Sequence, residues 1–134
     1  MLEMTVNFPG GKRVDAELAG RTIKTDQSVK SGGEGSAPEP YQYFLASIGT
    51  CAGIYVLGFC QARDIPVDGI QLKQRMHFHP TSHHLDRVEI EIQVPPSFPE
   101  KYLDAVRRAA EICAVKKAIL DPPEFQLSTR VTAA

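Results

Sequence analysis

The sequence lacks several features, and each absence narrows what the chain can be. Tryptophan is absent, no segment repeats, and there is neither a Gly-rich phosphate-binding motif nor a GxSxG nucleophile elbow. Lys and Arg total 15 against 16 Asp and Glu, so we expect no nucleic-acid partner. Residues 1–10 lack the basic and apolar regions of a signal peptide, which favours a cytoplasmic protein. The ordinary composition, 43% hydrophobic and 23% charged, predicts one soluble globular domain over residues 1–134 without a cofactor.

Cysteine is scarce, with Cys51, Cys60 and Cys113 as the whole complement. Three cysteines do not make a disulfide framework, so we expect free thiols, of which any pair that forms would be catalytic or redox-sensing. Cys51 and Cys60 lie nine positions apart, about 900° of helical rotation, and therefore on opposite faces of a helix. Cys113, in a second predicted helix, is the better partner for Cys51. The alternative is that the cysteines are small hydrophobic residues of the core.

The longest apolar run, Tyr41–Arg63, carries no charge before Arg63. As a helix it would be about 35 Å long, and Pro66 stops it. A membrane span is the competing interpretation, since about 20 apolar residues suffice. We reject it because polar residues dilute the run, namely Gln42, Ser47, Thr50 and Gln61. Apolar residues surround the whole helix, so we expect a partner subunit to cover part of it.

Alternating apolar and polar residues predict strands on both sides of this helix. Three strands, at residues 4–8, 13–18 and 21–25, form an N-terminal meander, and a loop over 26–38 follows. After the helix come a hairpin of strands 69–78 and 85–94, a second helix over 102–113 with a further turn at 115–120, and a last strand at 125–131. Ser97 is the expected cap of the second helix, with Glu100 at the capping-box position. The order β-β-β-α-β-β-α-β predicts an α+β fold.

Two further groups of side chains are candidates for binding. Four histidines gather at the predicted hairpin tip, at positions 77, 79, 83 and 84. Such a group resembles a metal site, but we expect polar residues of a turn and no bound metal. The aromatic residues of the long helix are either an apolar pocket next to Cys51 or plain core, and they are Tyr41, Tyr43, Phe44, Tyr55 and Phe59. Of these, Tyr43 and Tyr55 are the candidate ligand-binding residues.

Two stretches resemble the OsmC/Ohr family, most closely its YhfA-like branch. Residues 40–60, PYQYFLASIGTCAGIYVLGFC, resemble the central-helix motif, in which a proline and a polar residue precede an apolar run, small residues and a cysteine. Residues 111–119, EICAVKKAI, resemble the second cysteine motif, and the β-rich N-terminus and element order fit as well. The resemblance implies an intertwined homodimer with the long helices at its centre.

The better-known members of the family reduce organic hydroperoxides. By this resemblance Cys51 is the thiol that attacks the peroxide O–O bond, Cys113 is the thiol that resolves the product as a disulfide, and an external dithiol reduces that disulfide. The peroxidase members also use an arginine from the N-terminal meander to stabilise the thiolate. The segment GGKR at 10–13 matches best, so Arg13 is the candidate and Arg21 the reserve. The aromatic content of the helix favours an apolar or organic hydroperoxide.

The sequence departs from the family at the glutamate that holds this arginine. Tyr41 and Gln42 stand at the two positions where the branches place it, and a neutral Gln42 can bind an arginine without offsetting its charge. Glu39 or Glu34 is a possible substitute from the loop, and Ala114 stands where a proline commonly follows the second cysteine. The retained cysteines favour a hydroperoxide reductase. The lost glutamate favours a slow redox-sensing or small-molecule-binding module on the same fold.

Overall fold

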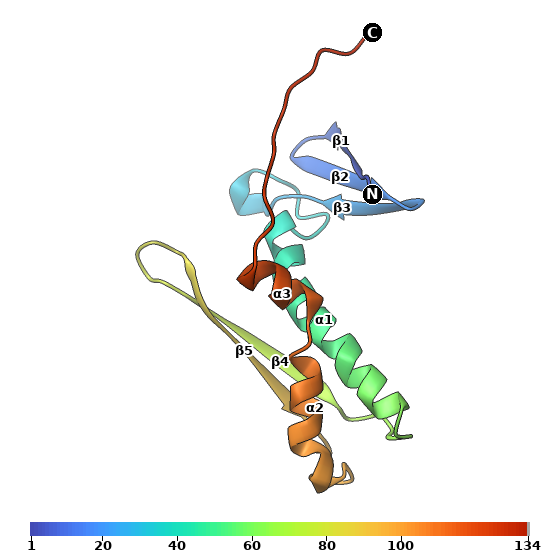
Figure 1. Cartoon of the computed structure of the whole chain (residues 1–134). Coiled ribbons are helices and arrows are strands. Elements are labelled where there is room, and N and C mark those ends of the chain that lie inside the picture. The colour runs from blue at the N-terminus through green and yellow to red at the C-terminus, as the bar shows by residue number, and fades with distance from the viewer. Residues whose placement is uncertain (134) are drawn as a thin grey trace. The chain divides into compact units, whose positions relative to one another are not determined.

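A computed structural model describes residues 1–133 of the chain (Figure 1). The element order is β1-β2-β3-α1-β4-β5-α2-α3, with two short 3-10 turns, which confirms the predicted mixture of an N-terminal meander, a long helix, a hairpin and shorter helices. The chain divides into two compact units, Met1–Ser47 and a second that begins at Ile48. The long helix α1 contributes to both. That residues 1–134 form a single domain stays a prediction.

The first unit contains an antiparallel sheet in the order β1-β2-β3. Its strands are Thr5–Gly10, Arg13–Leu18 and Arg21–Thr25, close to the predicted bounds. The turn between β1 and β2 requires glycine, because Gly10 and Gly11 have φ angles of 143° and 58°, which side chains disfavour. This turn places Arg13 at the start of β2.

The loop after β3 is organised around one buried carboxylate, Asp26, which is 1% exposed. It accepts hydrogen bonds from the Gln27 N–H at 2.7 Å, the Ser36 N–H at 3.0 Å and the Ser36 hydroxyl at 2.6 Å. The two Ser36 donors and the Gln27 N–H lower the pKa of Asp26 to about 2. A Cβ on Gly33 would overlap the Gln27 carbonyl, so the loop closes tightly around this carboxylate. The sequence predicts only a loop here, and no pattern in it singles out Asp26.

Helix α1 spans Pro40–Gln61 and buries one stripe of side chains in the second unit. The stripe follows helical spacing and consists of Ile48, Ala52, Val56, Phe59 and Cys60. The opposite side is open in the single chain, since Ile54 is 58% exposed. A Cβ on Gly49 would collide with the side-chain oxygen of Gln74 in strand β4, Gln71–Phe78, so a larger residue at this position would require the Gln74 side chain to move.

By length and apolar composition, α1 is able to cross a membrane. Of its apolar stretch of 18 residues, 28% is buried within the chain. The central helix of a soluble protein meets the same criteria, so these properties alone do not separate the two interpretations. The absence of a membrane partner stays a prediction.

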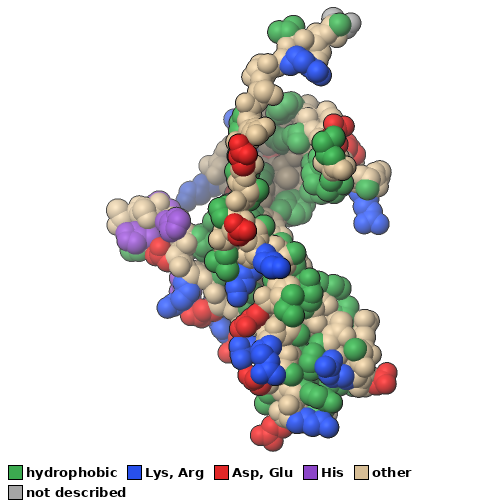
Figure 2. Space-filling model, viewed as in Figure 1, with side chains coloured by type: hydrophobic (Ala, Val, Ile, Leu, Met, Phe, Trp, Pro, Cys, Tyr) green, Lys and Arg blue, Asp and Glu red, His purple; other side chains and the backbone are tan. Residues whose placement is uncertain are grey.

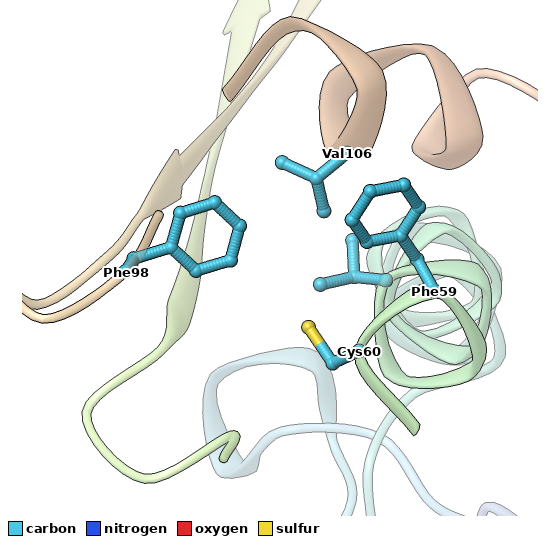
Figure 3. Packing of buried hydrophobic residues seen from close by; sticks show 5 residues of the cluster. Phe59, Cys60, Phe98 and Val106 are labelled. Atoms are coloured by element: carbon cyan, nitrogen blue, oxygen red, sulfur yellow. The ribbon is translucent and has the colours of Figure 1, made fainter. Parts of the chain in front are cut away.

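The core of the second unit lies between α1, the hairpin and helix α2, Leu103–Ala110. Strands β4, Gln71–Phe78, and β5, Leu85–Gln93, pair antiparallel as predicted, with Leu72 opposite Ile92. Phe59 and Cys60 from α1 meet Val106 from α2 and Phe98 from the segment after β5 (Figure 3). Cys60 is fully buried in this cluster, where it serves as a small apolar residue.

The second predicted helix ends three residues earlier than expected, and the predicted further turn is a separate helix. Helix α2 spans Leu103–Ala110 and α3 spans Ala114–Leu120, so Cys113 lies in the connection with φ −87° and ψ 123° rather than on a helix. The predicted cap is also wrong: a 3-10 turn, Glu100–Tyr102, intervenes after Pro99 without a side-chain cap. Because this turn separates Ser97 from Leu103, the Ser97 hydroxyl is too far along the chain to cap α2.

The predicted last strand does not form in the single chain. Residues 122–133 have no regular secondary structure and run as an extended segment after α3 (Figure 1). A strand is stabilised only by pairing with a neighbouring edge, and this segment pairs with none in the described chain. Its apolar residues are accordingly exposed, with Phe125 at 79%, Leu127 at 93% and Val131 at 96%.

Candidate functional site

Two of the three thiols meet in the second unit. Cys51 lies half-buried in α1, and Cys113, 3% exposed, lies between α2 and α3. The two cysteines are not bonded to each other, and the Cys113 thiol is a hydrogen-bond partner of the Cys51 sulfur. Cys60 lies apart in the core. The structure therefore brings Cys51 and Cys113 together, while their catalytic roles stay a prediction.

The surroundings of Cys51 favour its thiolate. The backbone N–H of Val115, the thiol of Cys113 and the backbone N–H of Ala114 lower the pKa of Cys51 below its usual value, although burial opposes them. Hydrogen bonds to the charged form have this effect generally. Since the thiolate is the nucleophilic form of cysteine, Cys51 is better prepared for reaction than an ordinary buried thiol. By contrast, burial raises the pKa of Cys60.

These donors are available because α3 starts beside Cys51. The first N–H groups of a helix have no partner within the helix, and Ala114 and Val115 are the first two residues of α3. Ala114 keeps an N–H group that the proline common in the family motif would lack. This departure from the family therefore adds a donor to Cys51. Sequence reasoning missed both donors, because backbone groups leave no residue pattern.

Cys113 is held firmly in place. Its sulfur accepts a hydrogen bond from the Lys116 N–H at 3.4 Å and so caps α3. Its thiol also donates to the Ile48 carbonyl at 3.9 Å. Cys113 thus links the start of α3 to α1.

A cavity of about 290 Å³ opens beside Cys113. Its wall is aliphatic and is formed by Ile48 and Ala52 of α1 and Val88, Ile90 and Ile92 of β5. Ala110, Cys113 and three charged residues, Arg107, Glu111 and Lys116, complete the lining. Cys113 lines this cavity, and Cys51 is not among its lining residues.

The candidate arginines lie in the first unit. Arg13 is exposed, and its Nε donates to the Gly10 carbonyl at 3.3 Å within the β1–β2 turn. Arg21 is exposed at the start of β3. Cys51 belongs to the second unit. An arginine at Cys51 stays a prediction.

The two polar candidates before and within α1 have structural partners. Gln42 Oε1 accepts the Glu39 N–H at 2.9 Å, which is half of a capping box. Glu39 Oε1 accepts the Ser28 N–H at 3.2 Å and so ties the loop to the start of α1. The Glu34 N–H interacts with Asp26 in the same loop. Within residues 1–133, neither Glu39 nor Glu34 forms an ion pair with an arginine.

Most aromatic residues of α1 are partly exposed in the single chain rather than buried in its core. Phe59 is buried, whereas Tyr41, Tyr43, Phe44 and Tyr55 are between 37% and 49% exposed. Tyr43 donates its hydroxyl to the Lys24 carbonyl at 2.7 Å, which ties α1 to β3. The role of Tyr43 and Tyr55 in binding stays a prediction.

The histidines gather at the tip of the β4–β5 hairpin (Figure 2). His79 Nδ1 accepts the N–H groups of Thr81 and Ser82, and His77 lies 3.3 Å from Glu89. These contacts are typical of a turn. Over the described part of the chain, no group of three or more His, Cys, Asp or Glu is arranged to hold a metal ion.

The chain was compared with protein families and with proteins of known structure. The family model described as OsmC-like protein matches residues 33–128, which include both Cys51 and Cys113. No protein of curated function matches the chain.

Several solved structures share the fold. A candidate osmotic stress induced and detoxification response protein from Psychrobacter arcticus is 21% identical, with a TM-score of 0.72 and 88% of each chain covered. An OsmC-like protein of unknown function from Vibrio cholerae is 12% identical, with a TM-score of 0.65, covering 88% of this chain and 92% of that one. An organic hydroperoxide resistance protein from Legionella pneumophila is 16% identical, with a TM-score of 0.54 over 89% and 90%. At these identities the likeness concerns the fold.

Proposed function

The chain belongs to the OsmC-like protein family, and from this premise we propose that it is a thiol-dependent reductase of organic hydroperoxides. The family supports a redox and stress-response protein fold. The observation that carries the finer proposal is the contact of Cys51 with the Cys113 thiol and two backbone N–H groups. A thiol with a lowered pKa next to a second thiol is the arrangement that a two-cysteine reductase needs.

The first step oxidises Cys51. Its thiolate attacks the outer oxygen of R–O–O–H, the S–O bond forms and the O–O bond breaks. The sulfur becomes a sulfenic acid, and the leaving alkoxide takes up a proton to give the alcohol. The N–H groups of Val115 and Ala114 stabilise the thiolate before attack.

The second step forms the disulfide. The Cys113 sulfur attacks the Cys51 sulfur, the S–O bond breaks, and hydroxide leaves with the Cys113 proton as water. An external dithiol then supplies two electrons and two protons, restoring both thiols and becoming a disulfide itself.

Arg13 is the proposed cation at the Cys51 thiolate, with Arg21 as the alternative. A cation next to a thiolate lowers the pKa of the thiol further. Gln42 and Glu39 are the proposed partners of that arginine, although the single side-chain oxygen of Gln42 and one of the two oxygens of Glu39 already accept hydrogen bonds at the start of α1.

We also propose a homodimer in the cytoplasm. A second subunit would cover the exposed aromatic residues of α1, including Tyr43 and Tyr55, and form an apolar wall for an organic substrate. Three unbonded cysteines suit a reducing compartment.

The test is single-turnover thiol loss with cumene hydroperoxide, followed by peptide mapping. We expect a Cys51–Cys113 disulfide, and we expect Cys51→Ser to abolish peroxide consumption. Cys60→Ala is the matched control, because Cys60 lies in the core away from the thiol pair. If both thiols stay reduced over minutes in excess peroxide, the proposal is wrong.

The second candidate is a redox-sensing or small-molecule-binding module. It is favoured by Tyr41 and Gln42 at the family's glutamate positions and by the absence of an ion pair at Glu39 within residues 1–133. Formation of the disulfide in a single slow event, with no multiple turnovers when a dithiol is supplied, would favour this function.

A further inference from the structure

The second unit contains another cavity, of about 280 Å³, which shares no lining residue with the cavity beside Cys113. It is lined by residues from two segments, 63–66, which follows α1, and 95–102, which follows β5. No cysteine lines it. The proposed reaction of the thiols therefore leaves this cavity without a function.

The wall after β5 is held by two consecutive turns. The Phe98 N–H donates to the Pro95 carbonyl at 3.0 Å, and the Tyr102 N–H donates to the Pro99 carbonyl at 3.0 Å. The two proline rings restrict the backbone of these turns further. This wall is therefore formed before any ligand arrives, as is usual for small-molecule sites.

Arg63 belongs to the wall after α1 and is fixed against aromatic rings. Its guanidinium carbon lies 3.7 Å from the centre of the Phe59 ring and 5.5 Å from the centre of the Tyr102 ring. Its Nη1 donates to the Phe59 carbonyl at 3.2 Å. These contacts use few of the N–H donors of a guanidinium, and Arg63 forms no ion pair with any residue from 1 to 133.

Lys101 adds a second cation at the same ring. Its ammonium nitrogen lies 5.1 Å from the centre of the Tyr102 ring. The carboxylate of Asp64 also belongs to the lining, but within the described part of the chain it pairs with neither cation. With Arg63 and Lys101 against Asp64, the lining carries one net positive charge. This charge favours an anion as the ligand.

The rest of the wall is mostly apolar. Ile65, Phe98 and the proline rings supply it, and Phe98 also belongs to the core cluster of this unit (Figure 3). An apolar wall with a few charged groups is the usual composition of a small-molecule pocket. The ligand that fits this wall has an apolar body as well as a negative charge.

We propose that this cavity binds a small organic carboxylate, with its charged group at Arg63 and Lys101 and its apolar body against the apolar wall. A carboxylate matches the planar fork of a guanidinium. The volume is near the lower end of ligand pockets, about 300–1,000 Å³, which suits a small acid. This inference goes beyond the proposed function and does not depend on it, because the cavity contains neither thiol.

The experiment is a titration of the reduced full chain, followed through its amide NMR signals. The probes are benzoate, its neutral analogue benzamide, and acetate, which has the charge without the ring. We expect saturable shifts with benzoate in the segments 63–65 and 97–102. The dissociation constant of benzoate should be at least about fivefold lower than that of benzamide, which is the effect of one unit charge at contact distance in water. It should also be lower than that of acetate.

The charge preference is tested with Lys101→Glu, and Lys117→Glu is the matched control. Both lysines are exposed, and only Lys101 lines the cavity. Comparing the ratio of the benzoate and benzamide constants between variants cancels any general change in the apolar wall. Lys101→Glu should reduce the preference for benzoate at least about fivefold, whereas Lys117→Glu should leave it within about twofold.

Four results would each overturn the inference. They are the absence of saturable shifts in the two segments, equal affinity for benzoate and benzamide, affinity for acetate equal to that for benzoate, and an equal loss of preference in both variants. Because the titration uses reduced protein without peroxide, none of these results bears on the proposed function.

Discussion

Among single residues, Ala114 shows how a departure from a family motif changes chemistry. The family commonly has proline after the second cysteine, whereas Ala114 here gives its N–H to the Cys51 sulfur. Proline is favoured at the first position of a helix, and the extended backbone of Cys113 is compatible with a following proline. An Ala114→Pro protein should therefore fold normally and lose only this donor.

We expect the pH midpoint of Cys51 alkylation to lie below about 8.5, the value of a free cysteine, because the N–H groups and the Cys113 thiol stabilise its thiolate. The midpoint of Cys60 should lie above it, because burial raises the pKa of Cys60. In Ala114→Pro the Cys51 midpoint should rise while that of Cys60 stays constant. Iodoacetamide labelling with peptide mapping measures both. Equal midpoints for Cys51 and Cys60 would contradict the described surroundings.

Among the elements, the loop around Asp26 is expected to make the stability of the fold depend on pH. The pKa of Asp26 is lowered from 3.8 to about 2, so the folded chain binds its proton less readily than the unfolded chain. The stability from this carboxylate is therefore complete above about pH 4 and is lost as the pH falls towards about 2. Asp26→Asn, which cannot accept all three hydrogen bonds, should lower the urea midpoint at neutral pH.

The measurement compares urea unfolding of wild type and Asp26→Asn across the acid range. The difference in urea midpoint should shrink from about pH 4 downward, because Asp26 of the wild type loses its stabilising charge there. The other carboxylates titrate in both proteins, so their effects cancel in the difference. Asp68→Asn, in an exposed turn of the second unit, is the control and should differ little from wild type at any pH. A difference that stays constant down to about pH 2 would mean that the Asp26 hydrogen bonds do not stabilise the folded state.

The elements also show what the sequence predicts well and what it does not. Alternation and apolar spacing located five strands and α1 to within a few residues, because these patterns reflect local burial. The position of Cys113 between two helices was not predicted, since it depends on the tertiary contact of its thiol with Ile48. The buried role of Asp26 likewise depends on Ser36, ten residues away. Contacts of this kind leave no periodic signal.

The whole molecule presents apolar surface that a single chain leaves uncovered. Ile54 on α1 and Leu127 in the C-terminal segment are 58% and 93% exposed. Exposed apolar patches mark interaction surfaces, and the predicted last strand has the alternation of a strand without a pairing edge. Both features fit a second copy of the chain, while the length and composition of α1 also fit a membrane.

Sedimentation velocity without detergent separates these two outcomes. We expect a soluble dimer for the wild type, and we expect Ile54→Asp to shift it to monomer. An unpaired carboxylate in an interface costs about 3–5 kcal/mol, so the dissociation constant should rise at least about a hundredfold. Asp68→Lys, a charge change in an exposed turn, should leave the dimer unchanged. A wild type that stays in solution only with detergent would support the membrane interpretation, and a detergent-free monomer would contradict the dimer.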